Sequence, residues 1–168
     1  MDERTIQKNG EGIEVISDIA KESECWPFCD IKWDIPHVAE QIITALQGGK
    51  KRSGIYAEAE EKFLEIMILY QVARYGEKSS LGDVIRSYQK VSDGSDDDIK
   101  ERFDDIVDFI RDVNFYGAEL ATFYDKFKAE HDDYITAAIH FVELPLYILY
   151  NFASRKPRCF SIGDECRQ

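Results

Sequence analysis

The sequence predicts an all-α protein: a compact bundle of about six helices, preceded by an extended arm or a short strand. Three observations predict this fold class. Hydrophobic residues make up 44% of the 168 residues and include ten Phe and nine Tyr, which is enough for a packed core. Apolar residues recur at spacings of three and four along most of the chain, and capping patterns separate these segments. We therefore divide the chain into an N-terminal arm (1–30), a helical domain (31–153) and a C-terminal tail (154–168).

The first two helices are expected on either side of a basic, glycine-containing loop at 48–54. Asp34 is the candidate N-cap of the first helix, and Gly48 with Gly49 ends it. Its apolar positions are Ile35, Val38, Ala39, Ile42, Ile43 and Leu46. The second helix runs from about 55 to 75 and ends at Gly76. Its inward positions are Phe63, Ile66, Met67, Tyr70 and Val72.

Two capping patterns start the next two helices. Ser80 with Asp83 begins a short helix, and Ser95 with Asp98 begins a regular helix over about 96–113. The apolar face of this fourth helix consists of Ile99, Phe103, Ile106, Val107, Ile110 and Val113.

A fifth helix is expected over about 117–130 and a sixth from about Asp132. The sixth is apolar on nearly every side, so we expect it at the centre of the bundle. Pro145 is expected to kink or end it, and the polar tail starts at Ser154.

Half of the negative charge lies in one segment. The net charge is −12, and residues 93–112 contribute −6 of it with nine acidic and three basic residues. The acids lie opposite the apolar face of the fourth helix, which makes them candidates for binding a basic or mixed-charge protein. They are Asp97, Glu101, Asp104, Asp105, Asp108 and Asp112. The same charge argues against direct binding of nucleic acid, which needs clustered Lys and Arg.

Three acidic patterns resemble parts of catalytic sites, and none is complete. Asp104-Asp105-x-x-Asp108 resembles the aspartate-rich turn with which isoprenoid synthases hold Mg²⁺, but no second acidic motif matches it. The pair at 131–132 resembles the His-Asp dipeptide of metal-dependent phosphohydrolases without their further ligands. Acids at 58 and 61, with those at 101 and 104, resemble the carboxylates of helical nucleotide pyrophosphatases at too long a separation. A P-loop is missing. We expect no enzyme activity, no metal and no cofactor.

The cysteines and the hydropathy indicate a cytoplasmic chain. Cys25, Cys29, Cys159 and Cys166 lie near the two ends, and reduced thiols are the default reading. A disulfide joining the ends, or a metal site, stays open as an alternative. The polar N-terminus has no signal-peptide pattern. No apolar run reaches the roughly 18 residues of a membrane span.

Residues 31–149 resemble the all-alpha domain of type IV coupling proteins, the hexameric ATPases of conjugation and type IV secretion. The likeness rests on IKWDIPHVAEQIITAL (31–46), on the aromatic-led helix ending in an aliphatic-Leu-Tyr segment, and on the capped helix SSLGDVIRSY (79–88). It covers about 70% of the chain as a pattern of apolar and capping positions. At 55–56, Ile-Tyr replaces the aromatic pair often found in the family.

This resemblance implies a non-catalytic domain that receives relaxases, accessory proteins or effectors for delivery to the secretion channel. The parent protein would be hexameric, would lie at the cytoplasmic face of the inner membrane and would carry the Walker motifs in another domain. The alternative hypothesis is a small acidic phage or plasmid inhibitor that blocks the basic groove of a nucleic-acid-binding protein.

Overall fold

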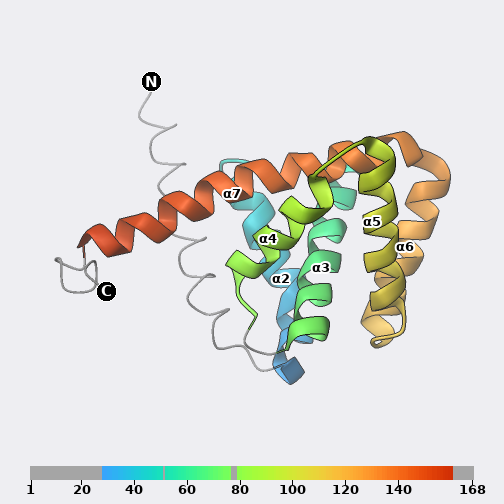
Figure 1. Ribbon diagram of the computed structural model, residues 1–168, viewed down its shortest axis with the longest axis horizontal. Helices are drawn as coiled ribbons and strands as arrows, with labels where there is room; N and C mark the ends of the chain where they lie inside the picture. The colour runs from blue at the N-terminus through green and yellow to red at the C-terminus, as the bar shows by residue number, and fades with distance from the viewer. Residues whose placement is uncertain (1–27, 51, 77–78, 161–168) are drawn as a thin grey trace.

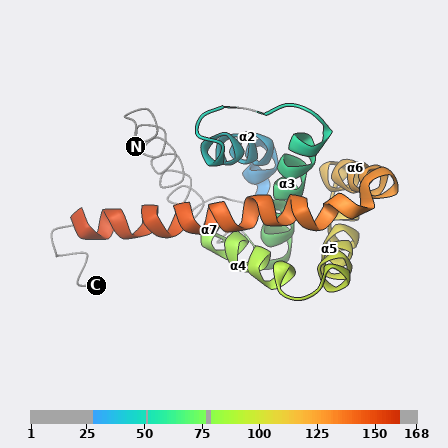
Figure 2. The same ribbon diagram turned by 90° about the horizontal axis from the view of Figure 1, so that it is seen from above.

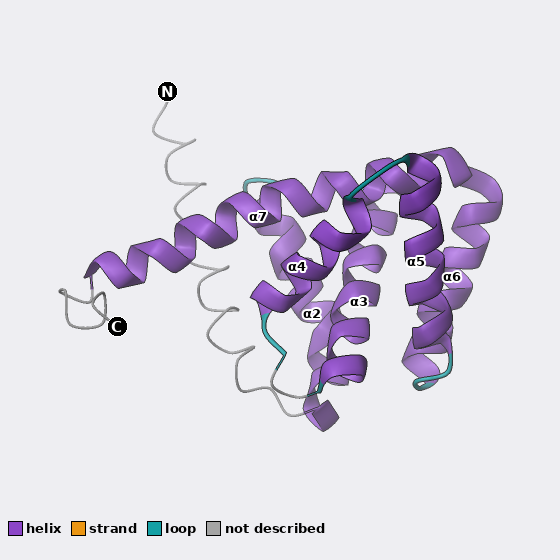
Figure 3. Cartoon of the chain, in the orientation of Figure 1, coloured by secondary structure: helices purple, strands orange, loops and turns teal. Residues whose placement is uncertain are grey.

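The computed structural model describes residues 28–50, 52–76 and 79–160, with side chains over 35–50, 52–76 and 79–151. Its elements are α2 (Phe28–Leu46), α3 (Ile55–Tyr75), α4 (Leu81–Ser92), α5 (Asp96–Arg111), α6 (Phe115–His131), the short 3₁₀ helix η1 (Asp132–Tyr134) and α7 (Ile135–Phe160). No described residue lies in a strand, so the all-α prediction is confirmed (Figure 3). The predicted arm lies outside the described residues, apart from 28–30, which belong to α2.

Helix α7 runs across one end of the other helices (Figures 1 and 2). It contacts α2, α3, α4 and α5, and continues past residue 153 as far as Phe160. Its outer face exposes a stripe of large apolar side chains: Phe141, Leu144, Tyr147 and Ile148. In the described part of the chain, no helix combines the length and the apolar character needed to cross a membrane.

The capping predictions at α4 and α5 are confirmed in full. Ser80 Oγ accepts a hydrogen bond from the Asp83 backbone N–H at 3.3 Å, and Asp83 Oδ2 accepts one from the Ser80 N–H at 2.9 Å. Ser95 and Asp98 exchange the same two bonds, each at 3.3 Å. These bonds satisfy backbone donors that have no partner inside the helix. The Ser95 hydroxyl and N–H also lower the pKa of Asp98.

The prediction for the start of the first helix is wrong, and one of the two outcomes expected at Pro145 does not occur. Asp34 does not cap α2, because the helix begins at Phe28 and runs through both Asp34 and Pro36. Ile35, Val38 and Ala39, on either side of Pro36, are buried, and their burial offsets the roughly 3 kcal/mol that a proline costs inside a helix. Pro145 does not end α7. The carbonyl that loses its partner belongs to Phe141 on the exposed face, where water can replace the missing N–H.

The central helix is α3 rather than the last helix. Helix α3 contacts α2, α4, α5, α6 and α7, whereas α7 lies across their ends with one face exposed. Phe63 of α3 is fully buried, with its ring centroid 4.9 Å from that of Phe103 and 5.6 Å from those of Tyr124 and Phe127. This aromatic cluster joins α3 to α5 and α6, and edge-on and tilted pairs of this kind are favourable.

Helix α3 also buries two carboxylates, Glu60 and Glu65. Glu65 is 2% exposed, accepts a hydrogen bond from the Tyr116 hydroxyl and lies 3.6 Å from Lys62 Nζ. Glu60 pairs with Arg52 at 3.1 Å through one oxygen, while its other oxygen has no hydrogen-bond partner. Burial raises the pKa of both carboxyl groups, against the opposing effect of these partners. Their charges therefore oppose folding at neutral pH.

Glu65→Gln is expected to stabilise the protein at pH 7 and to have little effect near pH 4. A carboxyl whose pKa is raised by folding binds its proton more tightly in the native state. Stability is then lost as pH rises from the unfolded value of about 4.3 through the native pKa. Glutamine removes the charge and keeps an acceptor for Tyr116. Urea unfolding from pH 3.5 to 8 measures the difference, with Glu58→Gln on the exposed side of α3 as control. A less stable variant at pH 7 would contradict this account.

Gly117→Ala is expected to destabilise the fold by about 1–3 kcal/mol, the usual cost of overpacking. A methyl group on Gly117 would overlap the backbone carbonyl oxygen of Ile110 and approach Leu69 Cδ2 to 3.4 Å, so α5 and α6 would have to separate. The control is Thr122→Ala, an exposed change in the same helix, expected to stay within about 0.5 kcal/mol. Equal unfolding midpoints in urea for the two variants would show that α5 and α6 can move apart at Gly117 without a measurable loss of stability.

Candidate partner-binding surface

The six acidic residues singled out in the sequence fall into two groups. Asp104 is half-buried at the contact between α5 and α6. The other five are exposed and follow one another along the outer side of α5 and its C-cap, Asp112, three or four residues apart. We call these five the acidic ridge: Asp97, Glu101, Asp105, Asp108 and Asp112.

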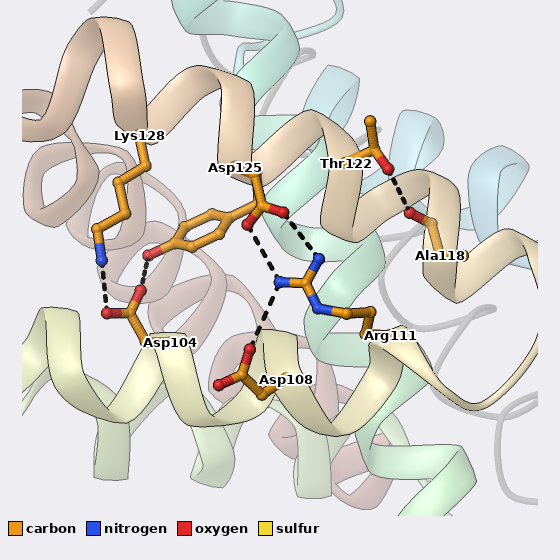
Figure 4. A network of polar contacts seen from close by, with 8 residues as sticks. Asp104, Asp108, Arg111, Ala118, Thr122, Asp125 and Lys128 are labelled. Carbon is orange, nitrogen blue, oxygen red and sulfur yellow. Dashed lines mark hydrogen bonds and ion pairs between the residues drawn. The ribbon is translucent and has the colours of Figure 1, made fainter.

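Asp104 belongs to a network between α5 and α6 (Figure 4). One of its oxygens accepts a hydrogen bond from the Tyr124 hydroxyl at 2.5 Å, and the other lies 2.5 Å from Lys128 Nζ. Burial, together with the hydrogen bond to Asp104, raises the pKa of Tyr124. Because its charge is balanced by Lys128, Asp104 contributes to helix packing more than to the negative surface.

Arg111, two turns after Asp104 on α5, makes a second set of contacts to α6. Its guanidinium donates to both oxygens of Asp125, at 2.7 and 3.1 Å, and lies 3.4 Å from Asp108 (Figure 4). The paired hydrogen bonds from Arg111 lower the pKa of the Asp125 carboxyl. Asp108 stands at the edge of this network with 73% of its side chain exposed, so it still faces solvent.

The rest of the ridge is free to meet a partner. Within the described part of the chain, the carboxylates of Asp97, Glu101, Asp105 and Asp112 make no hydrogen bond or ion pair. Lys100 of the same helix pairs with Asp132 at 2.9 Å. A row of exposed carboxylates on a rigid helix attracts Lys and Arg side chains of another protein.

Beside the ridge lies a groove of about 370 Å³ between α3, α4 and α5, which the sequence analysis missed. We call it the aromatic–basic groove. Its lining side chains include Tyr70, Arg74, Tyr75, Lys90, Arg102, Asp105 and Phe109. Asp105 belongs to both the ridge and the groove, and Phe109 follows it one turn along α5, so the two features share one surface. The i, i+4 pairs Tyr70–Arg74 and Asp105–Phe109 were visible signals, but nothing in the sequence indicated that α3 and α5 bring them together.

Two of the catalytic patterns weighed in the sequence, the aspartate-rich turn and the His-Asp pair, do not assemble. Asp104 points into the α6 contact while Asp105 lines the groove, so the aspartate-rich turn diverges. Asp132 is held by Lys100, and the ring of His131 packs against Tyr56. Among the described residues, no group of three His, Cys, Asp or Glu side chains has the arrangement of a metal site. The cysteine side chains lie outside the described set.

Asp104→Asn is expected to lower the free energy of unfolding more than Asp105→Asn does, although the two residues are neighbours in sequence. Asn at 104 loses the charge that holds Lys128 and the best acceptor for Tyr124, so we expect a loss of about 0.5–2 kcal/mol in the free energy of unfolding. The same change at 105 removes no internal partner and should cost less than about 0.5 kcal/mol. Chemical denaturation at pH 7 measures both. Equal effects would show that the α5–α6 network contributes nothing to stability.

Comparison with models of protein families, with curated proteins and with solved structures finds no match. The resemblance to the coupling-protein domain therefore rests on the residue pattern of 31–88. The contacts and charges of α5 and of the groove are independent of that resemblance, and they carry the functional argument that follows.

Proposed function

We propose that this chain is a non-catalytic recognition domain of a type IV coupling protein, and that it binds a protein substrate through the acidic ridge of α5. The substrate would be a relaxase, an accessory protein or a secreted effector, handed on to the secretion channel. The residue pattern of 31–88 supports the family, and the ridge supports the mode of binding. In this setting the domain works at the cytoplasmic face of the inner membrane beside an ATPase domain.

The exposure of the ridge is the observation that carries the proposal. Four of its carboxylates have no internal partner in the described part of the chain, and the fifth is only at the edge of the Arg111 network. Asp97, in the first turn, is favourable to the helix dipole, but the four acids that follow it do not stabilise the helix, since like charges three or four residues apart repel each other. Their gathering on one side, away from the cations of α6, favours a role in recognition.

The chemistry of the ridge specifies the partner's surface. Lys and Arg side chains spaced like successive helical turns would complement the carboxylates, and such contacts mainly raise the association rate and the specificity. They also make binding sensitive to salt, because exposed charges are screened within about 8–10 Å at physiological ionic strength. No cofactor or metal enters the proposal.

The inhibitor hypothesis uses the same ridge with a different partner. Exposed carboxylates on a rigid helix also suit the basic groove of a nucleic-acid-binding protein. A competition experiment, in which DNA is added to the complex of this chain with its partner, distinguishes the two functions. DNA displaces an inhibitor from its target, whereas a substrate held by a recognition domain keeps its own DNA-binding groove open.

Neutralising four of the five ridge residues is expected to weaken binding to purified relaxase or accessory protein about tenfold. The variant combines Glu101→Gln, Asp105→Asn, Asp108→Asn and Asp112→Asn. Four surface contacts of a few tenths of a kcal/mol each add up to roughly this factor. Biolayer interferometry at two salt concentrations measures the affinity, and the salt dependence should fall in the variant.

The control variant removes the same number of charges elsewhere. Glu58, Glu119, Glu130 and Asp133 are all exposed and lie outside α5, so their amide variants keep the net charge equal to that of the ridge variant. We expect less than about a twofold effect from this control. Equal losses in both variants would reduce the ridge to a contribution of net charge alone and would overturn the proposed binding mode.

A further inference from the structure

The aromatic–basic groove concentrates positive charge on a strongly acidic chain. Three cations, Arg74, Lys90 and Arg102, and one acid, Asp105, line it, whereas the whole chain carries −12. Its aromatic walls come from α3 and α5: the Tyr70 ring meets the Phe109 ring edge-on at 5.4 Å. A site with this composition suits a ligand that combines a negative group with an apolar one.

The guanidinium group of Arg74 has hydrogen-bond donors that a ligand can use. Its guanidinium carbon lies 5.7 Å from the ring centroids of both Tyr75 and Phe109, and its Nε donates to the Tyr75 hydroxyl at 3.4 Å. Contact with the two rings orients the guanidinium without neutralising it. The same hydrogen bond lowers the pKa of Tyr75.

Lys90 is equally available, whereas Arg102 is not. Within the described residues, neither Arg74 nor Lys90 forms an ion pair with a carboxylate. Arg102, in contrast, donates to the backbone carbonyls of Lys90, Val91 and Asp93 and so holds the end of α4 in place. The groove therefore offers two cations, Arg74 of α3 and Lys90 of α4, and Arg102 fixes the end of α4 that carries Lys90.

A carboxylate of a protein partner fits this arrangement better than a nucleic acid does. Arginine pairs well with carboxylates and with phosphates, and aromatic walls accept either an apolar side chain or a base. A phosphate backbone, however, would continue past the groove along the acidic ridge and be repelled there. A single carboxylate flanked by basic residues is attracted at both places: the carboxylate by the cations of the groove and the basic residues by the acidic ridge.

We propose that the groove binds the side-chain carboxylate of an Asp or Glu in a short mixed-charge segment of the partner protein, between Arg74 and Lys90. An adjacent apolar side chain of that segment packs on Tyr75 and Phe109, and Lys or Arg residues next in sequence face the ridge. This inference rests on the proposed function, since it specifies the segment that the ridge helps to bind.

The spacing of the ridge limits the length of the segment. Along α5, Asp105 lies about 4.5 Å from Asp108 and about 6 Å from Glu101, at roughly 1.5 Å per residue. An extended peptide advances about 3.3 Å per residue. An advance of one or two residues in the extended segment therefore covers one step along the ridge, and we place its residues in the order acidic, apolar, basic or the reverse.

Two synthetic peptides distinguish binding of a carboxylate in the groove from attraction to the net charge of the whole chain. One is acetylated, amidated Gly-Glu-Phe-Lys-Lys-Gly, and the other has Gln in place of Glu. The chain of −12 attracts the Gln peptide more strongly at long range, because that peptide is more positive. We expect the Glu peptide nevertheless to bind about threefold tighter or better, since its carboxylate meets Arg74 and Lys90.

NMR titration of the ¹⁵N-labelled chain measures both affinities and locates the shifted amides. The double variant Arg74→Gln, Lys90→Gln should reverse the preference in favour of the Gln peptide. The control Lys50→Gln, Lys126→Gln changes two exposed lysines away from the groove and should leave the preference intact. The spectrum itself reports whether each variant is folded, and Lys90→Gln alone serves if the double variant is not.

Three results would overturn the proposal. The first is that the Gln peptide binds as tightly as the Glu peptide. The second is that the preference for the Glu peptide survives in the Arg74, Lys90 variant. The third is that the free C-terminal carboxylate of Gly-Lys-Lys-Phe binds the groove more tightly than the Glu side chain does. The ridge variant separates this failure from that of the proposed function. If it still weakens binding of the protein partner, the recognition function stands without the groove.

Discussion

The burial of α3 on all sides is the constraint on which the rest of the structure depends. Helix α3 contacts each of α2, α4, α5, α6 and α7, and Phe63 at its middle holds the rings of Phe103, Tyr124 and Phe127. Because α5 and α6 both pack on this ring, the rotation of α5 about its own axis is determined. Its apolar residues face α3, and its acids are turned outward. The candidate surface follows from this packing.

The acids of α5 then meet three different environments. On the side of α6, Lys128 and Arg111 compensate Asp104 and Asp125, as they must where two acidic helices approach each other. On the side of α4, Asp105 and Phe109 line a groove with basic side chains. Between them the ridge faces solvent. One amphipathic helix thus serves packing, a charged surface and a groove wall, and each role depends on the neighbour it meets.

Local signals predicted the fold well, and the misses have identifiable causes. Both capping boxes form as expected, because Ser and Asp three residues apart need only each other. Asp34 failed as a cap, and Pro145 failed as a stop, since burial around α2 and exposure behind α7 outweigh local preference. The central helix was misassigned for a related reason. Glu60 and Glu65 make α3 look half-polar, yet both carboxylates are buried by the helices around it.

By itself the sequence determined the helices, most of their ends and the separation of acidic from apolar residues on α5, because these depend on residues within one or two turns. Only the tertiary structure decided which acids are compensated and which are exposed. Asp104 is held by a lysine 24 residues away, and the groove joins residues of α3, α4 and α5 that no short-range pattern connects. Periodicity gives the face of a helix on which a side chain lies. The charge, ring or solvent that it meets there depends on how the helices pack.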